Sequence, residues 1–180
     1  MGALFLSEND NESREASIPI HICRPQDWEN FKSSLSDAQR TFAQARNFQG
    51  ETDQRVQLPG QHGEISTVLF GAGSADKDVL GGIRAGALSK SLPSKTYHFA
   101  TLPEDWDANI AAIGWGLGAY KFDAYLEAKK SFPSLILRAD QDRDEINNIV
   151  EAIHFGRDLI NTPSNDMGPC LLYTSDAADD

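Results

Sequence analysis

The order of hydrophobic and polar residues along the chain predicts a sheet of strands interleaved with helices. Five short apolar runs, each bounded by glycine, proline or polar residues, are typical of strands. They lie near residues 18–23, 55–58, 64–70, 97–101 and 134–139. Between them, apolar residues recur at steps of three and four, as one face of a helix requires. These stripes predict helices at about residues 28–45, 77–92, 103–120 and 142–160.

Two of the predicted helices have aspartate where a helix should begin. Asp27 precedes the first stripe, and Asp142 or Asp144 opens the last one. An aspartate at this position accepts hydrogen bonds from the free N–H groups of the first turn. The last helix also gathers isoleucine and valine on one side, at Ile146, Ile149, Val150, Ile153 and Ile160. We expect this side to pack on the same domain or on a domain that lies after it in the chain.

Strands that alternate with helices of this length are typical of βαβ units. We therefore expect an α/β domain over residues 17–140, with a mixed, mostly parallel sheet and helices on both faces. The turn at residues 59–63 contains proline and two glycines, and it predicts an antiparallel hairpin within the sheet. Residues 1–16 are polar and acidic after the first six, so we expect a disordered leader there.

Composition excludes several classes of function. The 180 residues include 27 acidic and 16 basic side chains, which gives a net charge of −11. Such a charge opposes binding to nucleic acid or to an anionic membrane surface. The two cysteines, Cys23 and Cys170, form no CxxC pair, so a disulfide framework or a zinc ribbon is excluded. These features favour a cytoplasmic protein.

Two groups of glycines allow more than one interpretation. Gly71 and Gly73 follow a predicted strand, where a phosphate-binding loop could begin. The dinucleotide motif needs a third glycine where this chain has Asp76, so a plain strand-to-helix turn is the better interpretation. Gly114, Gly116 and Gly118 lie inside a predicted helix, where each destabilises it. Their presence indicates close approach to a neighbouring strand or subunit, or else a ligand against the backbone.

The titratable residues do not form a recognisable active site. His21, His62, His98 and His154 have no partner histidine at helical spacing, and His21 with Cys23 lacks an orienting carboxylate. The acidic residues within 140–145 suit the first turn of a helix without any metal ion. We therefore assign no catalytic, cofactor-binding or metal-binding residue in this chain.

Two segments resemble the cytosolic leucyl aminopeptidase family. They are residues 112–125, with the sequence AIGWGLGAYKFDAY, and residues 156–169, with the sequence GRDLINTPSNDMGP. The resemblance covers residues 18–169 and implies a macro-domain-like N-terminal α/β domain. It also implies that residues 141–169 form a linker helix and the start of a catalytic domain. Members of this family remove N-terminal residues from peptides, use two divalent cations, zinc or manganese, and assemble as hexamers.

The resemblance places the chemistry outside this chain. The lysine, aspartate and glutamate ligands of the family have no counterpart here, so we expect the chain to be inactive alone, with peptide substrates bound by the missing domain. Residues 170–180 depart from the family pattern, and we expect them to be a non-native tail. Residues 161–169 are expected to form a turn and interdomain contacts, or to support the catalytic site indirectly.

Two other functions remain open at this point. One is a stand-alone macro-like module that binds a small molecule or a nucleotide at the carboxyl ends of its strands. The other is an oligomerisation module that joins the parent enzyme without catalysing a reaction.

Overall fold

One mixed sheet organises the fold. The computed structural model describes residues 3–7, 16–123, 125, 132–163 and 166. Within these residues, six strands lie in the order β1-β6-β5-β2-β4-β3. Their bounds are β1 Phe5–Ser7, β2 Ile18–Cys23, β3 Arg55–Pro59, β4 Ile65–Gly71, β5 Thr96–Thr101 and β6 Ser134–Leu137. Neighbouring strands are parallel except for the β3–β4 hairpin, so the predicted mixed, mostly parallel sheet is confirmed.

The structure corrects the predicted strands at the two ends of the domain: it adds one strand near the N-terminus and shortens the last one. The sequence predicts a disordered leader that includes Phe5–Ser7, but this segment forms β1 and pairs in parallel with Leu135, Ile136 and Leu137. The Phe5 side chain is buried in the core, which explains why so short a segment belongs to the sheet. The strand predicted at 134–139 ends at Leu137, because Arg138 and Gln141 form a turn.

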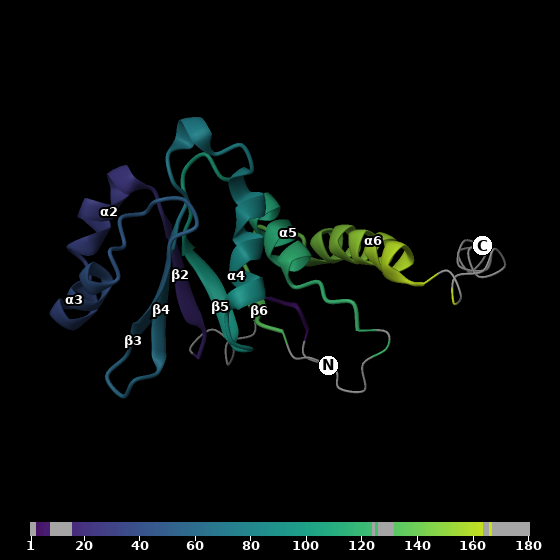
Figure 1. The fold of residues 1–180 in the computed structure, drawn as a ribbon, viewed down its shortest axis with the longest axis horizontal. Helices are drawn as coiled ribbons and strands as arrows, with labels where there is room; N and C mark the ends of the chain where they lie inside the picture. The colour runs from purple at the N-terminus through teal and green to yellow at the C-terminus, as the bar shows by residue number, and fades with distance from the viewer. Residues whose placement is uncertain (1–2, 8–15, 124, 126–131, 164–165, 167–180) are drawn as a thin grey trace.

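Helices cover both faces of the sheet, as Figure 1 shows: α2 and α3 lie on one side, and α4, α5 and α6 lie on the other. Two short 3-10 helices, η1 and η2, precede α4. The bounds are α2 Pro25–Lys32, α3 Asp37–Ala45, η1 Ala75–Lys77, η2 Gly81–Ala85, α4 Gly86–Ser91, α5 Ala108–Gly118 and α6 Arg143–Asn161.

The helix predicted at 28–45 is two helices. The hydroxyls of Ser33 and Ser34 donate to the carbonyls of Asn30 and Phe31, which ends α2. Ser36 then starts α3 with a capping box, in which serine and Gln39 each bond the other's backbone N–H. Asp27 is not the cap expected of it, because α2 begins two residues earlier.

Two other predicted helices are shorter than expected. The stretch at 77–92 divides into η1, η2 and the six residues of α4. The helix predicted from Pro103 begins only at Ala108, because the side chain of Asp107 accepts from the N–H groups of Asn109 and Ile110. The helix predicted at 142–160 is α6, and Asp142 caps it through Asp144 N–H and Glu145 N–H.

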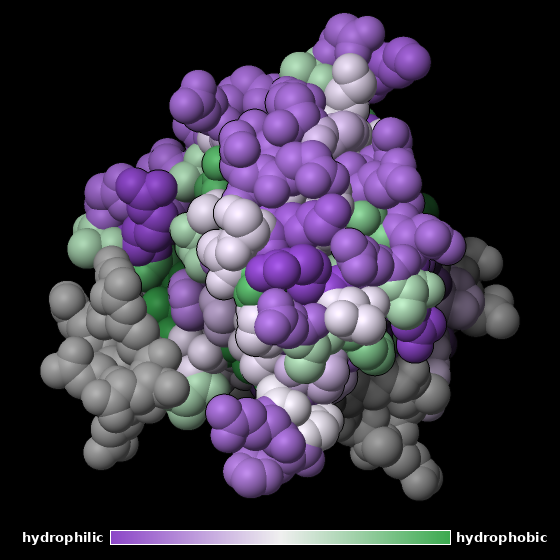
Figure 2. All heavy atoms as spheres, turned by 90° about the vertical axis from the view of Figure 1, so that its left-hand side faces the viewer, coloured by the Kyte–Doolittle hydropathy of each residue, from purple (hydrophilic) through white to green (hydrophobic). Residues whose placement is uncertain are grey.

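Each face of the sheet buries its own apolar core. The larger core lies between the sheet and α4, α5 and α6, and includes Tyr97, Leu88 and Trp115. The smaller core lies under α2 and α3 and includes Trp28 and Leu69. Figure 2 views the molecule from the side of α2 and α3, and its surface is mainly hydrophilic. The outer sides of these two helices therefore face solvent, while their apolar stripes face the sheet.

The glycines of α5 let neighbouring backbones approach, as one interpretation predicts, although the neighbour is a helix segment rather than a strand. A Cβ atom on Gly114 would lie 2.7 Å from both Cα and the carbonyl oxygen of Ile83 in η2. Gly118 meets the backbone of Gly86 at the start of α4. Gly116 points elsewhere, and its Cβ would lie 2.6 Å from a methyl group of Val150 in α6. Thus α5 packs closely on both sides.

We predict that Gly114→Ala destabilises the protein by about 1–3 kcal/mol, because the added methyl group meets backbone atoms that have little room to move. The matched control is Gly156→Ala in α6, where a Cβ meets nothing within 4 Å. This control should stabilise the protein by about 0.5–1 kcal/mol through helix propensity alone. Urea unfolding monitored by circular dichroism measures both; equal effects of the two substitutions would contradict the close packing.

Candidate functional site

The sheet has a crevice at the carboxyl ends of β2 and β5, where α/β folds commonly bind ligands. After β2 the chain forms β3 and β4 on one side of that strand. It then crosses to the other side of β2 and forms β5 there. Such a reversal of strand order opens a gap outside the strand ends. Here a cleft of about 460 Å³ is lined by Cys23 and Arg24 at the end of β2 and by residues 101–105 at the end of β5.

A buried arginine closes the base of this cleft. Arg24 is 2% exposed, and its guanidinium donates to the Asp105 carboxylate, to the Gly73 carbonyl at 2.9 Å and to Asp78 at 3.1 Å. Asp105 is half exposed, whereas the Asp78 side chain is 1% exposed. The network joins the end of β2 to the two loops that follow β4 and β5.

Asp78 is the centre of this network. It also accepts from Trp106 Nε1 at 2.7 Å, from Arg84 Nε at 3.2 Å and from the Gly81 N–H at 3.1 Å. Burial alone raises the pKa of Asp78, but hydrogen bonds from Trp106, Arg84 and Arg24 outweigh it and lower the pKa from the ordinary value of 3.8. The residue is therefore a fully paired carboxylate at neutral pH.

The cleft does not suit an anionic ligand. Arg24 donates four hydrogen bonds to Asp78, Asp105 and Gly73, so a phosphate that needs two of its five N–H donors would have to break one of these bonds. Asp27 and Glu104 add further negative charge to the lining. Repulsion from these carboxylates opposes the nucleotide that a macro-like module would bind.

The sequence candidates near this cleft have structural partners. His21 Nδ1 lies 3.1 Å from Thr101 Oγ1, and its ring packs on Phe31. Burial, and then the charge of His98, lower the pKa of His21 to about 4. Burial, and then the Asp27 carboxylate, raise the pKa of the Cys23 thiol to about 12. His21 is therefore neutral and the Cys23 thiol protonated at neutral pH.

The remaining histidines lie apart. His98 hydrogen-bonds Ser17 Oγ at 2.9 Å, His62 is exposed in the β3–β4 turn, and His154 lies in α6. Among the described residues, no group of three or more His, Cys, Asp or Glu side chains could hold a metal ion. Asp142 serves as the cap of α6, as expected.

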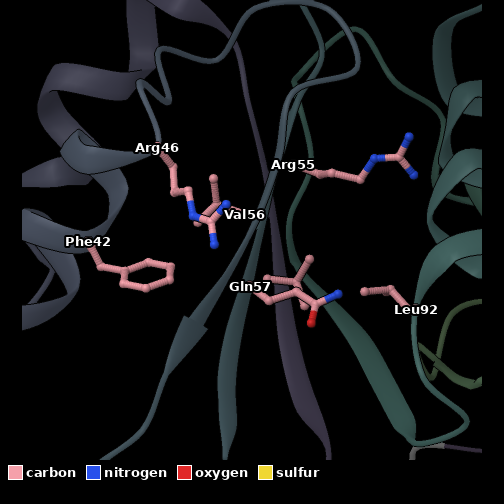
Figure 3. A pocket seen from close by; sticks show the side chains of 7 residues that line it. Phe42, Arg46, Arg55, Val56, Gln57 and Leu92 are labelled. Atoms are coloured by element: carbon pink, nitrogen blue, oxygen red, sulfur yellow. The ribbon is translucent and has the colours of Figure 1, made fainter. Parts of the chain in front are cut away.

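A second hollow crosses the edge strand β3 and is shown in Figure 3. It measures about 300 Å³, and β3 divides its lining. Val56 points toward α3, where Arg46 lies over the Phe42 ring at 5.5 Å. Arg55 and Gln57 point to the opposite side, and Arg55 donates to the Ala87 carbonyl at 3.2 Å. These side chains do not converge on one point, so the hollow is a poor candidate for a specific site.

The junction of α5 and α6 is held by polar contacts. His154 Nε2 lies 3.0 Å from the carbonyl oxygen of Gly116, and Arg157 donates to the Leu117 carbonyl at 2.8 Å. The Tyr120 hydroxyl donates to Asp158 at 2.8 Å. Because these bonds come from successive turns of α6, they fix its direction relative to α5.

The isoleucine side of α6 is divided between the core and the surface. Ile146 and Val150 are buried against the domain, as expected. Ile149, Ile153 and Ile160 are 37%, 38% and 84% exposed, so this domain covers only part of the isoleucine side, and packing of the rest on a later domain stays a prediction. The helix ends at Asn161, and Pro163 keeps Thr162 extended. Of the remaining segment that resembles the family, residues 164, 165 and 167–169 lie outside the described residues.

Comparison with solved structures defines the class of protein. The cytosol aminopeptidase from Coxiella burnetii matches with a TM-score of 0.78 and 26% identity, over 96% of this chain and 36% of that chain. A mutant tomato leucine aminopeptidase (19% identity, TM-score 0.62, 87% of this chain and 37% of that chain) shares the fold. So does the bottromycin maturation enzyme BotP in complex with Mn (20% identity, TM-score 0.61, 86% of this chain and 34% of that chain).

The family is identified by the sequence comparison. The family model described as "M17 aminopeptidase, N-terminal domain" matches residues 18–138. The chain therefore belongs to the M17 aminopeptidase family and carries its N-terminal domain. This confirms both the resemblance and the fold class inferred from the sequence.

Curated relatives agree with this assignment. Two proteins named "probable cytosol aminopeptidase" match: one from Corynebacterium efficiens, 28% identical over 93% of this chain, and one from Streptomyces avermitilis, 33% identical over 47%. The chain spans 34% and 20% of their respective lengths. In the described part of the chain, no helix is long and apolar enough to cross a membrane.

We predict that Asp78→Asn lowers the free energy of unfolding by about 3 kcal/mol at neutral pH, because it leaves Arg24 and Arg84 without their shared buried counter-charge. The control is Asp76→Asn, two residues away and exposed, which should change stability little. Urea unfolding at pH 7 measures both variants.

The pH dependence of the unfolding free energy separates the effect of the Asp78 charge from the effect of the changed side-chain shape. Because the pKa of Asp78 is lowered by folding, its carboxylate stabilises the fold above the ordinary pKa of 3.8 and loses this effect as the pH falls through the folded-state pKa. The difference between the native protein and Asp78→Asn should therefore shrink below about pH 4. A difference that stays constant with pH would contradict the proposed role of the charge.

Proposed function

We propose that this chain supplies the N-terminal domain of a leucyl aminopeptidase, a metal-dependent hydrolase that removes N-terminal amino acids from peptides. The observation that carries the proposal is the family match over residues 18–138. The match to the Coxiella enzyme also supports the assignment to one part of a longer enzyme, since 96% of this chain corresponds to only 36% of that one. The hydrolytic activity would belong to the portion of these relatives that this chain does not span.

The proposed metal site lies in the same unspanned portion. The leucyl aminopeptidase resemblance favours two divalent cations, zinc or manganese, and the related BotP is described in complex with Mn. The described residues do not fit such a site, because they offer no group of three or more potential ligands. Hard divalent cations need several oxygen ligands held in a fixed arrangement. No step of the reaction is therefore assigned to residues of this chain.

Assembly and location are part of the same proposal. The family resemblance favours a hexamer built from full-length subunits, and the names of the curated relatives support a cytoplasmic location. Peptides would be bound by the catalytic portion. The net charge of −11 disfavours nucleic acid and anionic membranes as partners.

The domain itself would contribute support and positioning. Its carboxyl-edge cleft is closed by Arg24 and lined by carboxylates, which disfavours the alternative of a nucleotide-binding module. Its last helix, α6, is fixed to α5 and carries exposed isoleucines that are free to contact a later part of the protein. The alternative of an oligomerisation module would use the same helix, but nothing beyond this exposure favours it.

We predict that the purified 180-residue chain does not hydrolyse leucine p-nitroanilide with added manganese or zinc, because its described residues offer no ligand set for the cations. A longer product of the same gene that includes the rest of the family's length should hydrolyse it, and a chelator should abolish this activity. The two proteins are assayed side by side against a metal-only blank.

Chelator-sensitive turnover by the 180-residue chain, retained through stringent purification, would contradict the assignment of the chemistry to the other portion. An inactive longer product, with its metal bound, would contradict the proposed activity.

A further inference from the structure

Helix α6 has a second flank that the domain does not use. Ile146, Val150 and His154 face the sheet and α5, where they are buried or hydrogen-bonded. At about 100° per residue, positions 149, 153, 156 and 160 fall together on another flank of the helix. The isoleucines on this flank are all exposed. An apolar strip on the surface of a helix is typical of a contact site.

Gly156 is a second, independent feature of this flank that suits a close contact. A glycine inside a helix destabilises it relative to alanine, so it is retained where a neighbour needs the space. Each glycine within α5 has such a neighbour in this chain: η2 for Gly114, α6 for Gly116 and α4 for Gly118. Gly156 has none, because a Cβ atom there meets nothing within 4 Å. The space beside Gly156 is therefore open in this chain, although the residue type suits a close contact.

We propose that the flank of α6 formed by Ile149, Ile153, Gly156 and Ile160 is the contact surface for an apolar segment of the catalytic portion, whose backbone approaches α6 at Gly156. The proposal rests on the proposed function, since it takes the partner from the part of the family's length that this chain does not span. The new elements are the surface on which the catalytic portion packs and the residue, Gly156, that sets how closely its backbone approaches α6.

Three observations favour this partner over a second copy of the chain. The N-terminal family model ends at residue 138, so α6 comes directly after that domain and before the remaining length of the relatives. Figure 1 shows the C-terminal half of α6 extending past α5, away from the sheet. The net charge of −11 makes two copies repel each other, which opposes a close pairing of two α6 flanks.

The test compares one substitution in two proteins, the 180-residue chain and the longer product that includes the catalytic portion. Gly156→Gln adds a side chain that ends in a polar amide, and glutamine favours a helix more than glycine does. The matched control is Asn148→Gln, an exposed position on a different flank of α6. Thermal unfolding is measured for both proteins and for both variants of each, with sedimentation of the shorter chain and its Gly156→Gln variant.

In the 180-residue chain we expect Gly156→Gln to raise the Tm by about 1–3 °C through helix propensity alone. In the longer product the same change should lower the Tm by about 3 °C or more, because the side chain enters an occupied contact. Asn148→Gln should have the same small effect in both proteins. The reversal of sign is the signature of a contact present only in the longer protein.

Two results would overturn the proposal. A rise in Tm in both proteins would show that the catalytic portion leaves Gly156 uncovered. A dimer of the 180-residue chain that Gly156→Gln dissociates would assign the flank to a second copy. Neither result depends on catalysis: hydrolysis of leucine p-nitroanilide by the unsubstituted longer product tests the proposed function separately.

Discussion

The close backbone packing of α5 against η2 and α4 is the contact on which the rest of this domain depends. It is possible only because Gly114 and Gly118 lack side chains where the backbones of Ile83 and Gly86 approach. The opposite side of the same helix receives Val150 of α6 at Gly116. One helix therefore covers the sheet, anchors the segment that comes after β4 and holds α6. Small residues in a helix weaken it locally, but here they permit packing that side chains would prevent.

The buried charges at the carboxyl ends of the strands support the same packing. Asp78 follows η1 directly and accepts from the Gly81 N–H at the start of η2, so the carboxylate fixes the segment that α5 packs against. Arg24 extends this restraint to the end of β2, and Trp106 extends it to the segment before α5. The base of the cleft where other α/β folds bind ligands is thus formed by a network of buried charges that holds the loops together.

Periodicity in the sequence predicts the five longer strands and α6 well, because those segments bury several apolar residues in register. It misses β1, since three residues at Phe5–Ser7 are too few to show a period. It merges α2 and α3, whose boundary is made by serine side chains and leaves the apolar spacing intact. The Arg24 network cannot be predicted in this way either. Asp78 and Asp105 lie 54 and 81 residues after Arg24, and no rule of sequence spacing connects residues so far apart.

Native-state hydrogen exchange tests the central claim most directly, namely that α5 joins α6 to the sheet in one cooperative unit. If so, amides from the middle of α5 and from Ile146 to His154 should exchange only through global unfolding, with the same opening free energy as the amides of β2 and β4. The fraying C-terminal turn of α6 should exchange more easily. Exchange of the whole of α6 through a separate, low-energy opening, while α5 stays protected, would contradict the account.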